Sequence, residues 1–513
     1  MPSPQAPGLA RRIAANTLHA ASGRVVALVL WLVLTPAILK TLGAEGFGVW
    51  SLFFALTGYL GALDLGFSQA TLRYVAAAHA TDDAQTGGGV ATLSLLGYLV
   101  LGLLWALVIP AVREPVLHFL RVTPDVRPGA AYAITMGALV FALAGFTNTC
   151  VAVLQGSGRF DLANLVLLIV SAVQAAGIVL AIRMHGGLQG MVASTAIAWG
   201  LALIVALGVI AAAVPRFRWG APAAALRHVH SVWTFGGPMQ LSNVLGVMHQ
   251  QVDKVLLARF VALAAVAPYE LGLRVSTAAS TFSQLLLLAM LPAASAIHAS
   301  HDGAALEQLF RRANRYVLTV AAVLTAAFAG SAGPMFAAWL GTPPAGAELA
   351  LRGLIGVAYL AIAAGVGGAI ARGAGRTDLE AECSALAFGV HVALGLALVP
   401  RFGLIGAIAA IAAGNLLGML WFLWRLSGAL AWRRMPVLLE PFGWPLLIVA
   451  VGTAAGLGLG QLHLPGALGT PWPRFLLVGG ASVIAAALVA TLSGFLPYRE
   501  ALSLLAPSRR ADA

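Results

Sequence analysis

The sequence predicts an all-α integral membrane protein, and three observations carry this prediction. Of the 513 residues, 60% are apolar and 9% are charged, whereas soluble domains carry about 25% charged residues. The apolar residues form long unbroken runs, and about 20 such residues suffice for one membrane-spanning helix. These runs lack the short alternating segments of a transmembrane barrel. The composition therefore disfavours a soluble enzyme and leaves little chain for a soluble domain.

About fourteen apolar spans follow one another along the chain. Their approximate ranges are 14–42, 47–77, 89–112, 130–154, 162–183, 188–213, 231–258, 265–297, 317–339, 350–372, 380–399, 403–426, 442–461 and 474–496. The longest spans exceed the length of a straight crossing, so we expect them to tilt or to project beyond the bilayer. Among the connections, the segment 298–316 is expected to lie as an amphipathic helix on the cytoplasmic surface.

The basic residues predict which side of the membrane each connection faces. With fourteen spans, the termini and the loops on their side carry twice as many basic residues as the opposite loops. Because cytoplasmic loops are enriched in Lys and Arg, both termini are expected in the cytoplasm. The basic residues are scattered and form no long tract, so the net charge of +12 does not indicate nucleic-acid binding. Cys150 and Cys383 both lie inside apolar spans, which argues against a disulfide or a metal site.

An internal repeat divides the chain into two similar halves. The segment GSGRFDL at 156–162 recurs as GAGRTDL at 373–379, and GLQG at 187–190 recurs as GLIG at 403–406. The two offsets are nearly equal, and both segments fall between equivalent spans. The repeat predicts two pseudo-symmetric six-helix lobes plus two C-terminal helices, with substrate bound between the lobes. The predicted parts are an N-lobe at 1–213, a cytoplasmic linker at 214–230, a C-lobe at 231–427, and the last two spans with a cytoplasmic tail at 428–513.

The first repeated segment is expected to form a tight cytoplasmic turn in each lobe. Its glycines permit positive φ, and its aspartate can cap the helix that follows. We expect these turns to shape gating rather than to bind substrate. The candidate gating residues are Gly156, Gly158, Arg159 and Asp161, with their equivalents Gly373, Gly375, Arg376 and Asp378.

Polar side chains converge on the first two spans of each half. Charged groups inside a bilayer are costly and are usually functional, and on a helical wheel the polar residues of these four spans each share one face. In the second span, for example, the stripe runs from Thr57 through Asp64 to Thr71. The pattern predicts a hydrated cavity between the lobes. Its predicted residues are Arg24, Trp31, Asp64, Gln240, Asn243, Gln250, Asp253, Lys254, Tyr269 and Arg274.

The predicted cavity suits an anionic, sugar-bearing substrate. Its three basic side chains favour an anion, and its amides and hydroxyls can hydrogen-bond to sugar hydroxyls. The aromatic residues Trp31, Tyr59 and Tyr269 can stack against sugar rings. Asp64 and Asp253 are candidate carriers for a coupling proton or Na⁺, and the membrane potential acting on a charged substrate is an alternative driving force.

A structural role for the same charges stays open. Glu270 lies four residues before Arg274, so the two side chains can neutralise each other on one helix face. Asp64 can likewise pair with Arg24 and hold the first two helices together. Both alternatives predict that truncating these residues lowers protein levels rather than transport alone.

Short motifs in both halves resemble a known family of membrane proteins. The motifs are LGAEGFGVW at 42–50, DLGF at 64–67, RYVA at 73–76, FGGP at 235–238, and the later residues Asp253, Tyr269 and Arg274. Together they are similar to bacterial polysaccharide flippases. These are the O-antigen and exopolysaccharide repeat-unit exporters of the multidrug/oligosaccharidyl-lipid/polysaccharide (MOP) superfamily.

The resemblance implies a flippase that moves undecaprenyl-pyrophosphate-linked oligosaccharide repeat units from the cytoplasmic to the periplasmic leaflet by alternating access. Its products would serve the biosynthesis of surface polysaccharide, such as lipopolysaccharide O-antigen or exopolysaccharide. The resemblance also implies a multi-pass protein of the bacterial inner membrane. Its partners would be membrane lipid, the lipid-linked oligosaccharide, and a polysaccharide polymerase with its chain-length machinery. It implies no cofactor and no resident metal.

Within the superfamily, two other branches are alternatives. Lipid II flippases use arginines in their first helix, and Arg24 stands at a similar place here. The last two spans resemble the helix pair that forms a groove for the lipid tail in those flippases. Drug exporters commonly carry an acidic residue in the first helix, where this chain has Arg24, which argues against cationic drugs.

A membrane glycan polymerase or ligase is the enzymatic alternative. Such enzymes usually carry catalytic groups on a sizeable extracytoplasmic loop. The longest outer loop here, 113–129, offers only Glu114, His118 and Asp125, without a nucleophile motif or a metal cluster. We therefore predict a transporter and no catalytic residue.

Overall fold

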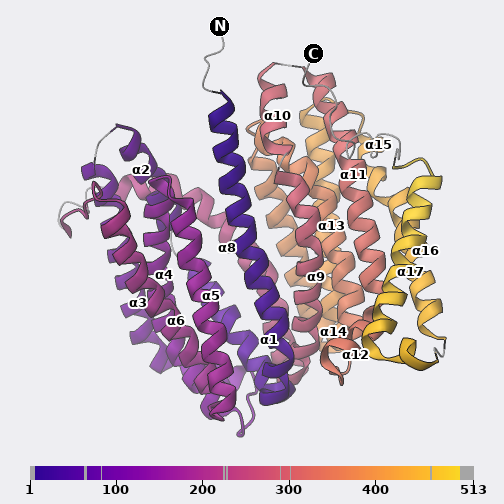
Figure 1. Cartoon of the computed structure of the whole chain (residues 1–513), viewed down its shortest axis with the longest axis horizontal. Helices are drawn as coiled ribbons and strands as arrows, with labels where there is room; N and C mark the ends of the chain where they lie inside the picture. Colours follow the sequence, from indigo (N-terminus) through magenta and orange to yellow (C-terminus); the bar gives the residue numbers. More distant parts are fainter. Residues whose placement is uncertain are drawn as a thin grey trace. The chain divides into compact units, whose positions relative to one another are not determined.

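The computed structural model describes residues 6–62, 66–81, 84–222, 226, 229–288, 290–300, 302–462 and 465–496 (Figure 1). Within these ranges all regular structure is helical, and ten helices are long and apolar enough to cross a membrane. The chain is therefore an all-α, multi-pass membrane protein, as its composition predicts. The count of fourteen spans stays a prediction.

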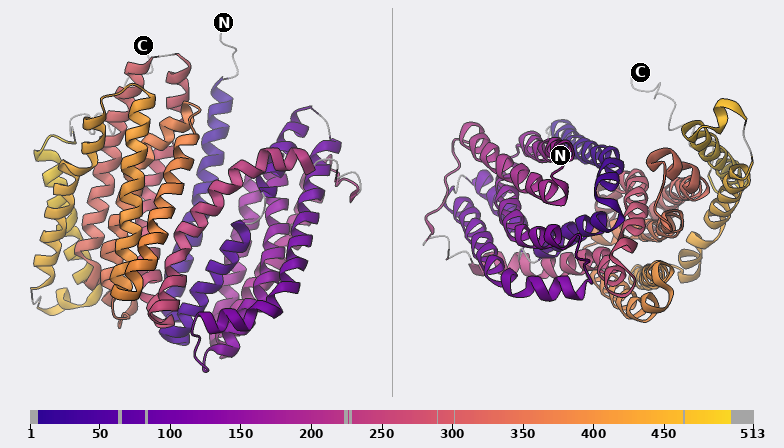
Figure 2. Two further views of the ribbon diagram at one scale, coloured as in Figure 1. Left: turned by 180° about the vertical axis from the view of Figure 1, so that it is seen from behind. Right: turned by 90° about the horizontal axis from the view of Figure 1, so that it is seen from below.

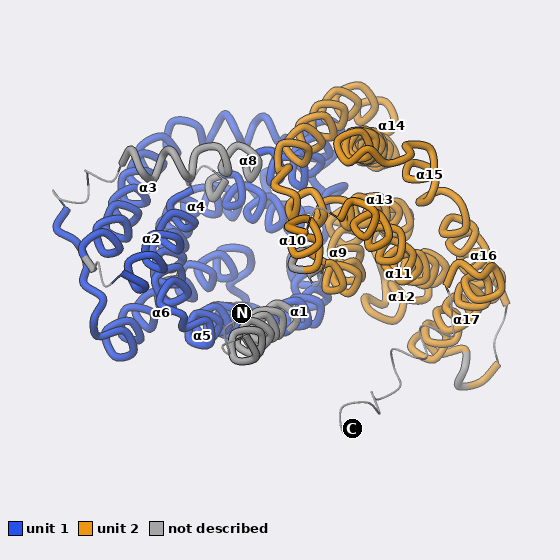
Figure 3. Tube along the Cα trace, turned by 90° about the horizontal axis from the view of Figure 1, so that it is seen from above, with its two compact units in different colours: residues 1–266 blue, residues 267–513 orange. Residues whose placement is uncertain are grey.

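The chain divides into two compact units, Met1–Val266 (unit 1) and Ala267–Ala513 (unit 2) (Figure 3). The helices of unit 1 are α1 (Ala6–Ala62), α2 (Phe67–Thr81), α3 (Ala84–Phe119), α4 (Arg127–Gly156), α5 (Phe160–Arg183), α6 (Gly187–Ala213), α8 (Val229–Phe260) and the short 3₁₀ helix η2 (Leu263–Ala265). Unit 1 thus extends through α8, which packs against α1 and α2.

The helices of unit 2 run from α9 to the end of the described chain. They are α9 (Val266–Leu288), α10 (Met290–Ala299), α11 (Gly303–Gly330), α12 (Ala332–Leu340), α13 (Ala347–Gly373), α14 (Asp378–Ala429), α15 (Arg434–Leu439), η3 (Glu440–Phe442), α16 (Trp444–Gly460), η4 (Gly466–Gly469) and α17 (Pro471–Leu492). The yellow helices α16 and α17 lie side by side in Figure 2 and pack against α11. In addition, the Tyr359 hydroxyl of α13 donates a 2.6 Å hydrogen bond to the carbonyl of Pro441. The last two helices are therefore part of the core of unit 2.

Two long helices each contain a glycine at which the chain doubles back. In α1, Gly43 has φ 67°, and the ring of Trp31 lies 5.6 Å from the ring of Phe54. Residues this far apart on one straight helix would be separated by roughly 35 Å. In α14, Gly403 has φ 57°, and Gly418 packs against Ala387 on the opposite arm. Each helix is therefore a hairpin of two arms, which agrees with the span boundaries expected near 42–47 and 399–403.

The second predicted span, 47–77, is not one continuous helix. The second arm of α1 ends at Ala62, Gly66 has φ 77°, and α2 begins at Phe67. A helical wheel drawn through this break is wrong, because the break resets the direction in which side chains point. The predicted single stripe from Thr57 to Thr71 therefore does not exist as one face.

The segment 298–316 was expected to be a separate surface helix, and this expectation is also wrong. Residues from Gly303 onwards belong to α11, which continues to Gly330. Leu306 and Phe310 are buried in the main core cluster of unit 2, while Arg311 pairs with Glu307 at 2.6 Å. The amphipathic pattern is real, but its apolar face packs on neighbouring helices.

Candidate functional site

In unit 1, α8 carries two buried ionisable side chains next to α1. Asp253 has no exposed surface and Lys254 is 3% exposed, and both take part in polar or electrostatic interactions. Asp253 acts electrostatically on Tyr59, which lies near the end of α1. Burying a charge is costly unless it is compensated. Asp253, its sequence neighbour Lys254 and Tyr59 are called the polar cluster Tyr59–Asp253–Lys254 below, and they include the buried ionisable groups of α8, whereas buried polar pairs such as Gln174 and Thr195 are neutral.

Two further side chains of unit 1 can serve a polar or sugar-bearing ligand. The Gln251 side-chain oxygen is buried and has no hydrogen-bond partner among the described residues, so it can accept a hydrogen bond from a ligand. On the first arm of α1, Trp31 packs against Trp50 at 6.4 Å and against Phe54. Trp31 is thus held in an aromatic cluster that leaves part of it accessible.

In unit 2, α9 carries the remaining predicted residues that the structure describes. Arg274 Nε donates to Glu270 Oε1 at 2.8 Å, and the two side chains are 16% and 10% exposed. The neutralising pair that the i, i+4 spacing allows is therefore formed. Tyr269 is fully buried on the same helix.

The other predicted cavity residues are described only in part. Asp64 lies outside the described residues. The side chains of Arg24, Gln240 and Asn243 also lie outside them, although their backbones belong to α1 and α8. Gln250 is exposed on α8. The cavity between two lobes stays a prediction, since the structure describes each unit by itself.

The two repeated turns, at 156–161 and 373–378, are called the twin turns below. Their backbone conformation agrees closely with the sequence prediction. Gly158 has φ 77° and Gly375 has φ 71°. The next residue in each turn, Arg159 or Arg376, donates its backbone N–H to the carbonyl five residues earlier at 2.8 Å. A glycine with positive φ followed by this bond is a Schellman motif. The second repeated segment matches too, with Gly187 at φ 52° and Gly403 at φ 57°.

Each turn also carries a two-pronged ion pair. Arg159 donates to both carboxylate oxygens of Asp161 at 3.1 and 3.0 Å, and Arg376 donates to those of Asp378 at 2.9 and 2.8 Å. These hydrogen bonds raise the pKa of both arginines, so the pairs stay ionised. Neither aspartate is the N-cap residue, which is Arg159 in α5 and Thr377 in α14, but each carboxylate accepts a hydrogen bond from the backbone N–H of the next residue, Leu162 or Leu379. The carboxylates lie in the first helical turn, where the helix dipole also favours them.

The first glycine of each turn packs against another helix in its own unit. A Cβ at Gly156 would lie 2.9 Å from the Cβ of Val75 on α2. A Cβ at Gly373 would lie 2.8 Å from the Cβ of Ala294 on α10. The first glycine of the turn thus makes an equivalent close contact in each unit, so the repeat extends to tertiary packing.

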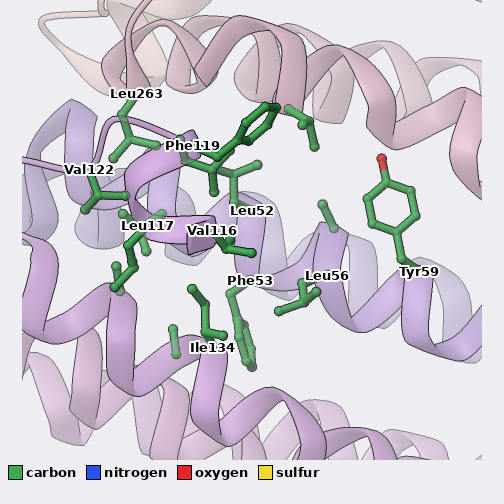
Figure 4. A pocket seen from close by; sticks show the side chains of 16 residues that line it. Leu52, Phe53, Leu56, Tyr59, Val116, Leu117, Phe119, Val122, Ile134 and Leu263 are labelled. Carbon is green, nitrogen blue, oxygen red and sulfur yellow. The ribbon is translucent and has the colours of Figure 1, made fainter. Parts of the chain in front are cut away.

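Sequence reasoning missed an apolar cavity in unit 1. It has a volume of about 260 Å³ and is lined by four segments, 49–59, 116–122, 130–134 and 255–263, which belong to α1, α3 with the connection that follows it, α4, and α8 with η2 (Figure 4). Its lining gave no signal because apolar residues in apolar spans carry no pattern of their own. Only the contact of four segments distant in sequence creates it.

A comparison with family models decides the family. The model of the polysaccharide biosynthesis protein family matches residues 13–298, which is more than half of the chain. The chain belongs to this family. A comparison with curated proteins finds no match.

Solved structures of the MOP superfamily share the fold of this family member. An inward-facing multidrug resistance MATE family transporter aligns with a TM-score of 0.67 and 18% identity, over 79% of this chain and 95% of that one. The lipid II flippase MurJ, in an inward closed conformation, aligns with a TM-score of 0.66 and 12% identity, over 95% and 99%. A MOP superfamily transporter from Pyrococcus furiosus aligns with a TM-score of 0.56 and 17% identity, over 82% and 96%. At these identities the similarity establishes the fold.

Proposed function

We propose that the protein is a flippase that moves undecaprenyl-pyrophosphate-linked oligosaccharide repeat units from the cytoplasmic to the periplasmic leaflet of the bacterial inner membrane. The observation that carries this proposal is the polar cluster Tyr59–Asp253–Lys254, from α1 and α8, inside a transporter fold of the polysaccharide biosynthesis family. A lipid-linked sugar needs a polar path for its headgroup, and we infer that this cluster, which is buried in the structure, contributes to that path. Both termini would lie in the cytoplasm, as the distribution of basic residues favours.

The chemistry of the cluster fits the headgroup of such a substrate. Lys254 provides a cation for the pyrophosphate, and the buried oxygen of Gln251 can accept a hydrogen bond from a sugar hydroxyl. Trp31 can stack on a sugar ring, since aromatic faces pack well against apolar sugar faces. In this proposal Asp253 is a candidate carrier of a coupling proton or Na⁺. It does not pair with Lys254, because adjacent residues on a helix point in different directions.

The twin turns support alternating access. Each turn ties the first residues of α5 or α14 to α2 or α10 through the close packing of Gly156 or Gly373. Each turn is held by a Schellman motif and an ion pair. We infer that it moves as one body with the helix that it contacts, α2 or α10. We infer that these turns transmit movement within their unit rather than contact substrate.

A lipid II flippase is the second candidate, and one observation favours it. MurJ aligns over 95% of this chain, whereas the MATE transporter aligns over 79%. A drug or cation antiporter lacks a comparable observation.

The decisive experiment is a deletion strain analysed for surface polysaccharide and for lipid-linked intermediates. The proposal expects loss of polymer, with undecaprenyl-linked repeat units accumulating in the cytoplasmic leaflet. Restoration by the wild-type gene, but not by one encoding Lys254→Gln, would connect the phenotype to the cluster. Normal polysaccharide together with raised sensitivity to cationic drugs would contradict the proposal. Accumulation of lipid II instead would select the second candidate.

A further inference from the structure

The apolar cavity of unit 1 lies beside the second arm of α1 and is almost free of polar groups. Among its lining side chains, only Tyr59 carries a polar atom (Figure 4). The other walls come from residues such as Leu52, Phe53, Val116 and Ile134. An apolar cavity does not hold ordered water, because water needs polar partners there. The walls therefore favour an apolar ligand.

The cavity reaches the surface at Phe119, and a cation lies next to this opening. Phe119 lines the cavity and is 49% exposed. The guanidinium carbon of Arg259 lies 5.3 Å from the centre of the Phe119 ring and 5.8 Å from that of Phe260. Arg259 is one helical turn beyond Val255, another lining residue. The opening thus combines an aromatic rim with one positive charge at the end of α8.

We propose that this cavity binds part of an acyl chain of a membrane phospholipid, whose phosphate lies at Arg259. Hydrocarbon surrounds a membrane-spanning helix bundle, and a chain segment that fills the cavity restores the dispersion contacts that an empty cavity loses. The planar guanidinium matches a phosphate group. The site therefore has one element for each part of the ligand, the apolar walls for the chain and Arg259 for the phosphate.

A phospholipid fits this site better than the isoprenoid chain of a transported substrate. The cavity is lined entirely from unit 1, so its walls need not rearrange while a substrate passes. Near the opening, the described lining offers no amide or hydroxyl for sugars, since Tyr59 lies at a different side of the cavity (Figure 4). We therefore assign the site to a resident lipid that stabilises unit 1.

Photo-crosslinking tests the site directly. The full-length protein is reconstituted with phosphatidylglycerol that carries a diazirine on its acyl chain, and crosslinked peptides are mapped by mass spectrometry. The proposal expects crosslinks concentrated at 49–56, 116–122 and 130–134. Equal labelling of Leu107, which is 82% exposed on α3, would overturn it. Undecaprenyl phosphate is added as a competitor, and its displacement of the probe at equimolar concentration would overturn the choice of a phospholipid.

Variants separate the two parts of the site. Ala133→Phe and Val116→Phe each fill the cavity and should abolish the localised crosslinks, whereas the matched control Leu107→Phe on α3 should keep them. Arg259→Gln should reduce retention of phosphatidylglycerol about tenfold, as expected for one charge-assisted hydrogen bond. Arg183→Gln, at an exposed position of α5, is its control. Equal retention in the two arginine variants would overturn the role of Arg259. Because the readout is lipid binding and not transport, it is independent of the proposed function.

Discussion

At the scale of single residues, the two lysines of the chain occupy opposite environments. Lys254 is 3% exposed in unit 1, whereas Lys40 is exposed at the end of the first arm of α1. A buried ammonium group is retained only if it is compensated or functional. This contrast provides a test with a control inside the same chain.

Lys254→Gln should abolish polysaccharide export and leave the protein level near that of the wild type. Glutamine keeps a polar group of similar length but removes the charge that we propose binds the pyrophosphate. Lys40→Gln should leave export unchanged. Export is measured as surface polysaccharide, and protein level by immunoblot of membranes. Loss of the Lys254→Gln protein itself would indicate that the charge serves packing. In that case Arg24→Ala should also lower the protein level, and Arg24→Lys should not restore export.

Glycines of the second repeat allow packing and backbone strain to be separated. Gly373→Ala should lower the free energy of unfolding by about 1–3 kcal/mol, because its Cβ meets the backbone of α10. Gly375→Ala should cost about 1–2 kcal/mol through its positive φ alone. Gly389→Ala, on an open face of α14, should stabilise by about 0.5–1 kcal/mol through helix propensity. Thermal unfolding in detergent measures this order, and a variant at Gly373 as stable as the one at Gly389 would contradict the packing.

At the scale of whole elements, the last two helices, α16 and α17, are either accessory to the core of unit 2 or part of it. Ile448 of α16 and Ala486 of α17 are fully buried in the core cluster of unit 2, together with Phe310 of α11. Small residues make this close packing possible, since a Cβ at Gly452 would lie 2.9 Å from the Cβ of Ala486. The helix pair therefore closes the core rather than flanking it.

Truncation after Leu439 should prevent accumulation of the protein in the membrane. The deletion removes the acceptor of the Tyr359 hydrogen bond and exposes apolar residues of α11 that have no substitute partner. A truncation after Leu496 should accumulate normally. Fluorescence of a fused reporter after size-exclusion chromatography distinguishes these outcomes, and a monodisperse peak for the shorter chain would show that α16 and α17 are dispensable.

At the scale of the whole molecule, membrane orientation is a prediction that follows from the basic residues. The connection at Ser157 and that at Thr377 lie in the twin turns, while Asp125 and Thr342 lie in connections at the opposite ends of their helices. If the chain crosses the membrane as predicted, the first pair faces the cytoplasm and the second pair the periplasm.

Single cysteines at these four positions test the orientation. In a background in which Cys150 and Cys383 are replaced by alanine, a membrane-impermeant maleimide added to intact spheroplasts should label Asp125→Cys and Thr342→Cys only. Ser157→Cys and Thr377→Cys should react after the membrane is opened. The reverse pattern would invert the topology, and a mixed pattern would disprove the predicted number of spans between the twin turns.

The sequence alone determined the features that depend on residues close together in the chain. Hydropathy located the helices, and the repeated GxGRxDL segments located both twin turns, because a Schellman motif needs only a glycine and a few neighbouring backbone groups. The repeat also indicated a two-part architecture. The i, i+4 spacing of Glu270 and Arg274 allowed their ion pair for the same local reason.

Only the tertiary structure decided which distant segments meet. It joined α8 to α1 in unit 1, divided the predicted span 47–77 at Gly66, and buried the apolar face of 303–316 in the core of unit 2. It also created the apolar cavity from four separate segments. In a chain with 60% apolar residues, lipid-facing and core-facing side chains look alike, so hydropathy cannot tell them apart. Packing between segments distant in sequence is what distinguishes them.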